Sequence, residues 1–515
     1  MNPKTSHKFK AFMIMMVAIV MFAGSVITPP QARTAYAGPV QSADDTAKID
    51  AYVQSMLDKL QIPGAAVGII RGDQVVYLKG YGISGSDQQP ITPQTPFIIG
   101  SSTKSFTALA TMQLVEQGKI DLDAPVRRYL PQFELADPEA PGQITVKNLL
   151  TQVSGFSTYH GRIAFSNHFA SIDELLDNQK KTPLTEPVGA KYQYSNLNFD
   201  ILGGIIEAVT NEPYSEYIQK HIFTPLEMKN SFTSTLEAKQ KGLATGYQPI
   251  FGYMTPMKQP DNPAMLASAY LISSAEDMAN YLIAQLNEGK FKDIMVASPA
   301  SISQMHEPFA EDSSINGYYG MGWEVIGDNI QHAGDIESFH SDMLLNGDTG
   351  IVVLINAHDY LVRGYKFNQI AYGILEIMHG QEPRQDGGGN LTRTNVIIDL
   401  ICAALVVLTG WAIYNLFRWN RKFKHTPLRI TVFVAWLLVF NLIVPAGILI
   451  LLGNYVTPWG MVFSFLPGIG HLAFILCVLW LCIGLVKIIL FVCSLMSHKK
   501  MNGFATAGSV PRLQH

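Results

Sequence analysis

The 515-residue chain has only four cysteines, and none of them lies before residue 402. All four fall in long apolar runs near the C-terminus: Cys402, Cys477, Cys482 and Cys493. The region of about 350 residues that precedes these runs therefore has no disulfide and no cysteine-ligated metal site. Its stability must come from its hydrophobic core, which a domain of that length can supply.

Basic residues are scarce in the central region. The chain has 37 basic and 41 acidic residues; residues 1–37 hold four basic and no acidic residues, and residues 394–515 hold nine basic and one acidic. Residues 38–393 are left with 24 basic and 40 acidic residues, a net charge of −16. A domain this acidic does not bind nucleic acid by counterion release, so no nucleic-acid partner is expected.

The Gly-x-Ser-x-Gly pattern of many Ser-His-Asp hydrolases is also absent. Instead, Ser101-Ser102-Thr103-Lys104 places a hydroxyl and an amine three residues apart. At a helix start, positions i and i+3 share a face, so the amine can lie against the hydroxyl. A buried lysine with a lowered pKa can then remove the serine proton. The spacing alone is weak evidence, because Ser497 and Lys500 share it.

The N-terminus has the pattern of a secretory signal peptide. Lys4, Lys8 and Lys10 precede the apolar run 11–27, and Ala35-Tyr36-Ala37 is a small-x-small cleavage signal. Residues 1–37 are therefore predicted to be removed after export, and an uncleaved N-terminal anchor is the alternative. In both cases the domain that follows, residues 38–384, is exported.

Three apolar runs near the C-terminus, residues 396–417, 430–452 and 469–492, are each long enough to cross a membrane as a helix. The segment between the first two is basic, and residues 453–468 carry no charge. By the positive-inside rule, the basic loop and the tail are cytoplasmic. The sequence thus predicts a glycine-rich linker at 385–395, three transmembrane helices within 396–493 and a cytoplasmic tail at 494–515. The protein is expected to be a multi-pass cell-membrane protein whose main domain is extracytoplasmic.

The periodicity of the exported domain predicts an α+β fold. Helical segments alternate with strand-like runs, and the first and last strands are expected to share one sheet. The predicted helices are residues 45–60, 105–118, 121–130, 146–150, 201–210 and 366–378. The predicted strands are residues 65–70, 74–79, 343–345 and 350–356.

Two further motifs support a shared site for Ser101 and Lys104. Tyr194-Ser195-Asn196 precedes an apolar helix, and His332-Ala333-Gly334 follows a strand-like region. Ser-x-x-Lys, Tyr-x-Asn and Lys/His-x-Gly, in this order, are the motifs of the penicillin-recognising serine hydrolases. The chain resembles their class C β-lactamase-like branch over roughly residues 45–380, which implies an antiparallel sheet combined with a helical domain.

The resemblance assigns a catalytic role to three residues. Ser101 would attack a carbonyl carbon and become the acyl-enzyme ester. Lys104 and Tyr194 would move the proton from Ser101 to the leaving group, and a phenol beside a lysine ammonium is expected to have a lowered pKa. No metal and no other cofactor is required.

The remaining site residues would bind substrate. Asn196 offers a donor and an acceptor to a substrate amide. The resemblance places the oxyanion hole at the backbone amides of Ser101 and of Asp335, which follows Gly334. His332 stands where β-lactamases have lysine, and it is mostly neutral near neutral pH. Together with nearby acidic residues, this disfavours a substrate with a carboxylate beside the scissile bond and favours a small neutral or amine-bearing peptide or amide.

The architecture carries a second resemblance. An exported penicillin-recognising domain followed by three membrane helices is similar to the prodrug-activating peptidases of the colibactin and zwittermicin pathways, which remove an N-acyl-D-asparagine leader. The favoured function is therefore a peptidase that cleaves an amide next to a D-amino acid. The alternatives are a D,D-carboxypeptidase, penicillin-binding protein or β-lactamase-like enzyme acting on cell-wall material, a carboxylesterase, and a non-enzymatic sensor of β-lactams or wall fragments. The sequence does not predict an oligomeric state.

Overall fold

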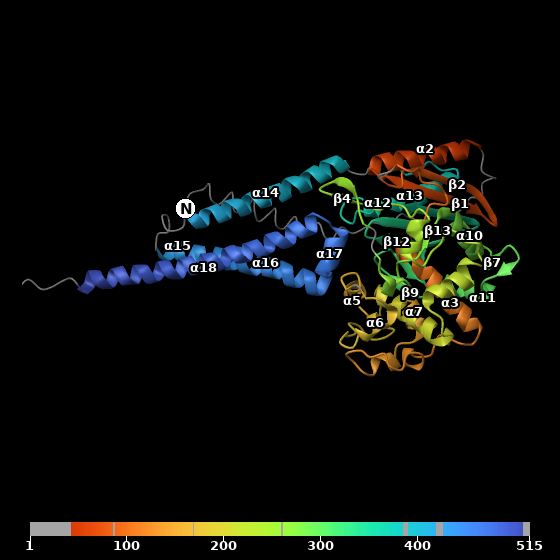
Figure 1. Ribbon diagram of the computed structural model, residues 1–515, viewed down its shortest axis with the longest axis horizontal. Helices are drawn as coiled ribbons and strands as arrows, with labels where there is room; N and C mark the ends of the chain where they lie inside the picture. Colours follow the sequence, from red (N-terminus) through yellow and green to blue (C-terminus); the bar gives the residue numbers. More distant parts are fainter. Residues whose placement is uncertain are drawn as a thin grey trace, which may run out of the picture.

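The computed structural model describes residues 43–85, 88–167, 169–258, 261–384, 390–418 and 426–507. The predicted signal peptide, the glycines of the linker, most of the basic loop and the end of the tail lie outside the described residues. The described chain has an α+β body at one end, as predicted, from which long helices project (Figure 1).

An antiparallel eight-stranded sheet forms the centre of the body, in the order β2-β1-β14-β13-β12-β11-β10-β9. Its strands are β1 (Gly64–Arg71), β2 (Gln74–Gly82), β9 (Ala310–Asp312), β10 (Gly317–Tyr319), β11 (Glu324–Ile326), β12 (Asn329–Ile336), β13 (Phe339–Asn346) and β14 (Thr349–Ile355). Strand β1 pairs with β14 from Ala65↔Ile355 to Arg71↔Thr349, which confirms that the first and last strands share a sheet. The other paired strands are β3 (Phe97–Ile98) with β6 (Ile272–Ser273), β4 (Tyr247–Ile250) with β5 (Tyr253–Pro256), and β7 (Lys290–Phe291) with β8 (Ile294–Met295).

Helices cover both faces of this sheet. On β1, Val67 and Ile69 belong to the core under α2 (Ala43–Leu60) and α13 (Gln369–Met378). Neighbouring β1 residues such as Ile70 belong to the second core, which includes α10 (Ala275–Leu286). This follows from the two-residue period of a strand, which sends alternate side chains to opposite faces. Both faces being buried explains why β1 and β14 are almost continuously apolar.

The rest of the body is mainly helical and packs below the sheet in the view of Figure 1. Its helices are α3 (Thr103–Glu116), α4 (Val146–Leu150), α5 (Thr158–Ile163), α6 (Ile172–Asp177), α7 (Asn196–Thr210), α8 (Tyr214–Ile218), α9 (Thr235–Gln240) and α11 (Pro299–Met305). A short helix, α12 (Gly364–Phe367), precedes α13. Helices α3 and α7 contact each other, and the catalytic candidates lie at their N-terminal ends.

Most predicted elements are present, and three helices differ in detail from the prediction. The helix predicted at 121–130 is only a one-turn 3-10 helix, Val126–Arg128, because Pro125 holds an extended conformation at its start. The helix predicted at 201–210 begins at Asn196, five residues earlier than expected. The helix predicted at 366–378 is divided between α12 and α13.

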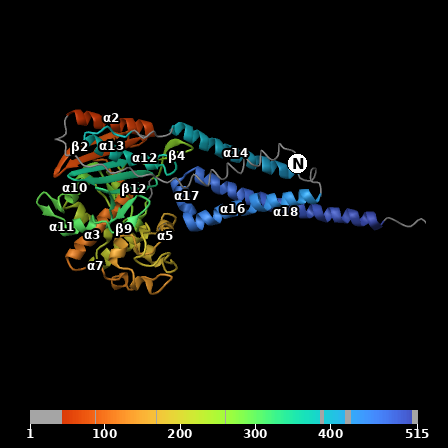
Figure 2. The same ribbon diagram turned by 180° about the vertical axis from the view of Figure 1, so that it is seen from behind.

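Three candidate membrane-spanning helices follow the body, as predicted: Leu391–Phe417, Pro427–Val456 and Ile469–Met496. The first is α14 (Leu391–Phe417), and the third is the start of α18 (Ile469–Ala507). The second comprises α15 (Pro427–Trp436), α16 (Val444–Gly447) and the π-helical turns Leu437–Ile443 and Ile448–Val456. A short helix, α17 (Trp459–Phe465), connects the second span to the third and lies beside the body in both Figures 1 and 2.

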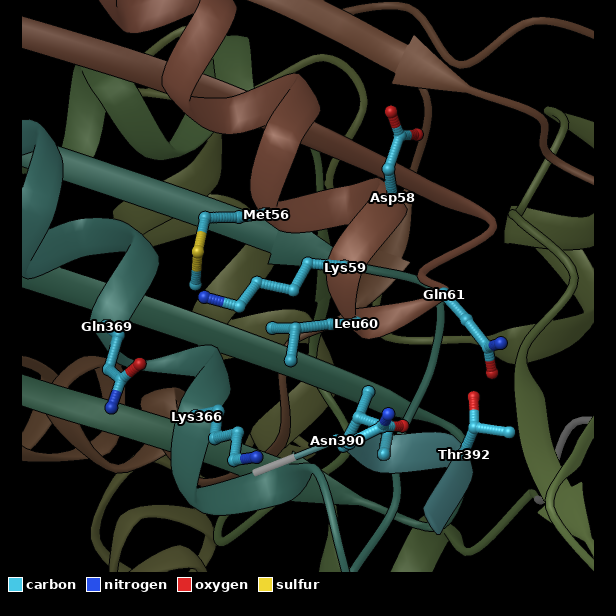
Figure 3. Close-up of a pocket in the computed structure, with 10 residues that line it drawn as sticks. Met56, Asp58, Lys59, Leu60, Gln61, Lys366, Gln369, Asn390 and Thr392 are labelled. Atoms are coloured by element: carbon cyan, nitrogen blue, oxygen red, sulfur yellow. The ribbon is translucent and has the colours of Figure 1, made fainter. Parts of the chain in front are cut away.

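A cavity of about 290 Å³ lies where the C-terminal end of α2 meets α12, α13 and the start of α14 (Figure 3). Lys59, Lys366 and Gln369 are among its lining residues. None of the predicted site residues lines it. It belongs to the junction between the body and the first membrane helix.

Candidate active site

Ser101 lies in a one-turn 3-10 helix, Gly100–Ser102, which joins β3 to α3. Its position differs slightly from the prediction, since α3 itself begins at Thr103. The tight 3-10 turn places side chains three residues apart nearly in line, so Ser101 and Lys104 meet. Ser101 is partly exposed, whereas Lys104 is completely buried in α3.

The Lys104 amine is held by three acceptors. Its Nζ donates to Ser101 Oγ at 2.9 Å, to Asn196 Oδ1 at 2.7 Å and to the Ser268 carbonyl at 2.8 Å. Burial lowers the pKa of Lys104 well below that of a free lysine, and the negative charge of Asp200 partly opposes this shift. The neutral amine keeps two of these bonds as a donor and presents its lone pair to Ser101. The geometry therefore suits a base for the Ser101 proton.

Asp200 is a site residue that the sequence reasoning missed. It is fully buried on α7, and neither carboxylate oxygen has a hydrogen bond within the described residues. The nearby Ser268 hydroxyl donates to the Met265 carbonyl at 3.3 Å instead. Burial raises the pKa of Asp200, while Ser268 and the Lys104 charge favour its ionised form. Its spacing of four residues from Asn196 on an apolar helix was the available signal, because i and i+4 share a face.

Tyr194 contacts the nucleophile directly. Its hydroxyl donates to Ser101 Oγ at 2.7 Å, so Lys104 and Tyr194 converge on the same oxygen. The Lys104 Nζ lies 4.9 Å from the centre of the Tyr194 ring and has no hydrogen bond to its hydroxyl. The expected fall in the Tyr194 pKa is wrong: burial raises it, although the bond to Ser101 partly opposes the rise. Tyr194 is therefore a neutral phenol that can donate a proton.

Asn196 is the first residue of α7, and it lies against α5. Its Oδ1 accepts from Lys104 at 2.7 Å, and its Nδ2 donates to the Gly161 carbonyl at 3.2 Å. Ser195, just before it, is held in place by Gln152, whose Oε1 accepts from the Ser195 backbone N–H at 2.9 Å. Asn196 thus connects Lys104 to α5.

Two glycines bring the backbone of β12 against the turn that carries Ser101. A Cβ on Gly100, whose φ is +53°, would lie 2.8 Å from the Asp335 nitrogen. A Cβ on Gly334 would lie 2.0 Å from the Ile99 carbonyl oxygen. Only glycine fits at both positions, because any side chain would separate the two backbones. The backbone amides of Ser101 and Asp335, the predicted oxyanion donors, therefore belong to segments in direct contact.

His332 lies in β12 and is almost completely buried, with 2% exposure. Its Nδ1 lies 2.7 Å from the Ala333 carbonyl, which can only accept, so this nitrogen carries the proton. Its Nε2 therefore accepts from the Tyr319 hydroxyl at 3.1 Å. Burial, reinforced by the Lys104 charge, lowers the pKa of His332 to about 3. The third motif thus begins with a neutral ring and not with a cation.

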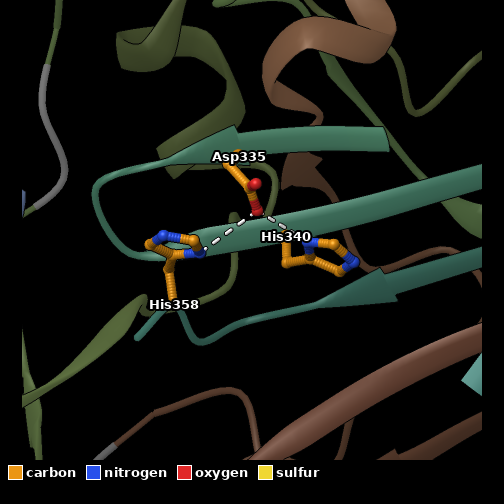
Figure 4. Close-up of side chains that lie close together, drawn as sticks. All are labelled: Asp335, His340 and His358. Carbon is orange, nitrogen blue, oxygen red and sulfur yellow. Dashed lines mark hydrogen bonds and ion pairs between the residues drawn. The ribbon is translucent and has the colours of Figure 1, made fainter. Parts of the chain in front are cut away.

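The Asp335 side chain lies between His340 and His358 (Figure 4). Its Oδ1 lies 2.7 Å from His340 Nδ1 and 3.2 Å from His358 Nδ1. His340 Nε2 lies 2.9 Å from Asp342 Oδ2, so both ring nitrogens of His340 face carboxylates. Burial alone would lower the pKa of His340, but Asp342 and Asp335 raise it to about 10. The resulting imidazolium fixes the side chain of a residue whose N–H is a predicted oxyanion donor.

These groups have the donor atoms of a metal site. The ligand atoms of Asp335, His340 and His358 lie within 4.8 Å of one another. However, a metal on His340 Nδ1 would have to displace a proton that two carboxylates stabilise. The donor set suits an ion-pair network better than a metal centre.

Comparisons with known proteins agree with this geometry. The family model described as Beta-lactamase matches residues 49–361. The chain belongs to the beta-lactamase family. With the fold described above, it is a β-lactamase-like serine hydrolase with three candidate transmembrane helices.

The relatives extend this likeness. Protein flp of Staphylococcus aureus strain MW2 is 32% identical over 328 residues, or 62% of this chain and 64% of that protein. Protein flp of strain MRSA252 is 29% identical over 449 residues, or 82% of this chain and 86% of that protein. The unguisins hydrolase ungD' of Aspergillus campestris is 25% identical over 347 residues, or 63% of this chain and 64% of that protein. An octameric penicillin-binding protein homologue from Pyrococcus abyssi superposes with a TM-score of 0.59 at 29% identity, covering 66% of this chain and 79% of that one.

Proposed function

We propose that this protein is a membrane-tethered, extracytoplasmic serine hydrolase that cleaves an amide through an acyl-enzyme at Ser101. The observation that carries the proposal is the convergence of Lys104 Nζ and the Tyr194 hydroxyl on Ser101 Oγ, at 2.9 and 2.7 Å. The catalytic domain's place outside the membrane rests on the predicted signal peptide and on the charge of the loops.

The chemistry follows from these positions. As Ser101 Oγ attacks the carbonyl carbon, its proton passes to the neutral amine of Lys104. The N–H groups of Ser101 and Asp335 stabilise the oxyanion. Tyr194 donates its proton to the leaving nitrogen and the C–N bond breaks, which leaves a Tyr194 phenolate and a Lys104 ammonium. Water then attacks the ester and gives a proton to the Tyr194 phenolate, and Lys104 returns its proton to Ser101 Oγ. The acid product leaves, and Ser101 is free again.

The surroundings of His332 support a substrate without a carboxylate beside the scissile bond. The ring is neutral, so the third motif offers no positive charge to a substrate carboxylate. Of the cations described above, Lys104 is buried, and His340 is already held between Asp335 and Asp342. The preference for a D-amino acid rests on the resemblance to prodrug-activating peptidases. The name of ungD' is that of a hydrolase of unguisins, which supports a peptidase-like role.

A carboxylesterase is the second candidate, because a neutral third motif accepts an ester as readily as an amide. A penicillin- or wall-directed enzyme has less support, since its substrates carry the carboxylate that a lysine at position 332 would bind. A sensor that forms an acyl-enzyme without turnover would need the same Ser101 chemistry.

The test uses the full chain purified in detergent, with Ser101→Ala as the control. A fluorophosphonate should label the wild type and not the variant, and absence of labelling would refute the acyl-enzyme. An N-acyl-D-asparagine amide, its L-epimer, an aryl ester and benzylpenicillin are then compared by kcat/KM. Preferential cleavage of the D-amide supports the proposal, faster ester turnover supports the esterase, and labelling without any turnover supports the sensor.

A further inference from the structure

The segment 453–468, which comprises the last residues of the second membrane helix and the loop to the third, packs on the body. Met461, Val462 and Phe465 are only 9%, 7% and 6% exposed. Met461 and Phe465 belong to the same hydrophobic core as α3 and α7. In Figures 1 and 2, α17 lies between the membrane helices and the body. This contact is more extensive than an anchor requires, since one apolar helix would hold the body at a membrane.

Two side chains of helix α5 bind backbone carbonyls of this segment. The Tyr159 hydroxyl donates to the Gly453 carbonyl at 3.0 Å. Arg162 Nη1 donates to the Val456 carbonyl at 3.2 Å. Both carbonyls belong to the end of the second membrane span, where no later helical turn uses them. The two donors lie on either side of Gly161, the residue that contacts Asn196.

The segment after α5 docks on α17 at close range. Ser166 Oγ accepts from the Met461 backbone N–H at 3.1 Å. A Cβ on Gly460 would lie 2.6 Å from Ser166 Oγ and 3.0 Å from Ser166 Cα. The rings of Phe165 and Phe465 make an edge-to-face contact, with centroids 5.4 Å apart. The two segments therefore fit only because residue 460 has no side chain.

The opposite side of α5 forms part of the active-site wall. The Gly161 carbonyl accepts from Asn196 Nδ2 at 3.2 Å, and Asn196 Oδ1 accepts from Lys104 at 2.7 Å. A Cβ on Gly161 would lie 2.6 Å from the Asn196 nitrogen, so α5 and the start of α7 touch without an intervening layer. A short helix of six residues has little stability of its own, so its position depends on its neighbours.

We propose that residues 453–468 are a positioning element of the active site: they hold α5 against Asn196 and thereby set the placement of the Lys104 amine. This inference rests on the proposed function of Ser101 and Lys104. The membrane part then contributes to catalysis as well as to location, and the positioning residues are Arg162, Ser166 and Gly460.

The test compares Gly460→Ala with Gly410→Ala in the full chain in detergent. The first substitution drives a Cβ into Ser166, whereas the Cβ of the second, in α14, meets no atom within 4 Å. Labelling of Ser101 by a fluorophosphonate should slow roughly tenfold or more for Gly460→Ala, since small displacements of catalytic groups cost that much. Gly410→Ala should label at the wild-type rate. Arg162→Met, which keeps the aliphatic stem and removes the donor, should also slow labelling.

The pH dependence separates positioning from folding. A displaced Asn196 changes the hydrogen bonding of the Lys104 ammonium, so the midpoint of the labelling rate against pH should move in Gly460→Ala and Arg162→Met. Titration of reactive Ser101 and the thermal midpoint report the folded fraction. Two outcomes would overturn the inference. In the first, the variants have a lower thermal midpoint, but the labelling rate per folded molecule and its pH midpoint are unchanged. In the second, Gly460→Ala and Arg162→Met are labelled at the same rate as Gly410→Ala. If the wild type itself is not labelled, the proposed function fails instead.

Discussion

Lys104 and Asp200 are both completely buried, and the charge of each shifts the pKa of the other; neither carboxylate oxygen of Asp200 has a hydrogen bond in the described part of the chain. Burial drives the two groups toward their neutral forms, because it lowers the pKa of Lys104 and raises that of Asp200. The charge of each group opposes the pKa shift of the other group. The pair therefore makes a lysine that can lose its proton near physiological pH and still regain it during the reaction.

The labelling of Ser101 should rise with pH through a midpoint far below the pKa of an ordinary lysine. The reason is that only neutral Lys104 can take the Ser101 proton, and burial stabilises that form. The measurement is the fluorophosphonate labelling rate of the full chain from pH 5 to 10. Lys104→Arg keeps a positive charge but cannot deprotonate, so it should reduce the rate roughly 10²-fold or more and remove the rise. A Lys104→Arg variant with the wild-type profile would exclude Lys104 as the base.

Replacing Asp200 by asparagine should move that midpoint to lower pH. The Asp200 charge raises the pKa of Lys104, so its removal leaves burial unopposed. Asparagine has nearly the same shape, which limits other changes. The measurement is the same labelling profile, with circular dichroism as a check on folding. A midpoint that stays in place or moves upward would contradict the assigned coupling.

Tyr194→Phe should reduce turnover of amides far more than turnover of activated esters. Burial keeps Tyr194 protonated, and its hydroxyl lies 2.7 Å from Ser101 Oγ, where it can donate to a leaving nitrogen. An amide needs this proton, whereas a nitrophenolate leaves without one. The expected loss is roughly 10²–10⁴-fold in kcat/KM for an amide. Equal losses for an amide and a nitrophenyl ester would instead indicate that Tyr194 acts before the leaving-group step.

Much of the fold followed from periodicity in the sequence. The apolar strand-like runs of β1 and β14, and the three long apolar runs at the C-terminus, indicated elements that the structure contains. The failures are local: Pro125 stops a helix that hydrophobic spacing favoured, and α7 extends back through a polar motif. The backbone conformation of Pro125 decided the first boundary, and a tertiary contact decided the second. Hydrophobic spacing predicts neither.

The candidate site was predictable in its parts but not in its electrostatics. Two motifs named Ser101, Lys104 and Tyr194, and the structure places Lys104 and Tyr194 within hydrogen-bonding distance of Ser101. The sign of the Tyr194 pKa shift was wrong, because the nearby ammonium was apparent from the motif whereas the burial of the ring was not. Asp200 was missed for the same reason, since a carboxylate on an apolar helix can face either solvent or the core. Burial depends on the whole fold and has no local signature.

His332→Lys should shift specificity toward substrates with a carboxylate. A lysine would replace a neutral ring by a cation beside Tyr319, in the position that penicillin-directed relatives use. The ratio of labelling rates for benzylpenicillin and a neutral fluorophosphonate should increase relative to the wild type. His332→Gln, which stays neutral, is the matched control. If the ratio increased in both variants, the effect would come from the changed size of the side chain and not from its charge.

His340 should stabilise the fold in a pH-dependent manner. Its pKa is raised to about 10 in the folded protein, against 6.5 for the unperturbed group. The sign follows from linkage: the imidazolium contributes fully below pH 6.5, and its contribution is lost as pH rises through about 10. The difference in thermal midpoint between the wild type and His340→Gln should therefore be largest near pH 6 and decrease steadily toward pH 10.

His306 provides the control for this experiment. Burial lowers its pKa to about 4, so it is neutral throughout the same range. The difference between the wild type and His306→Gln should stay constant from pH 8 to 10, where the folded histidine is neutral and the unfolded histidine binds almost no proton. A His340→Gln difference that is also constant would mean that His340 is neutral when folded. The Asp335 carboxylate would then lack the cation that fixes it, and the support proposed here for the oxyanion donor would fail.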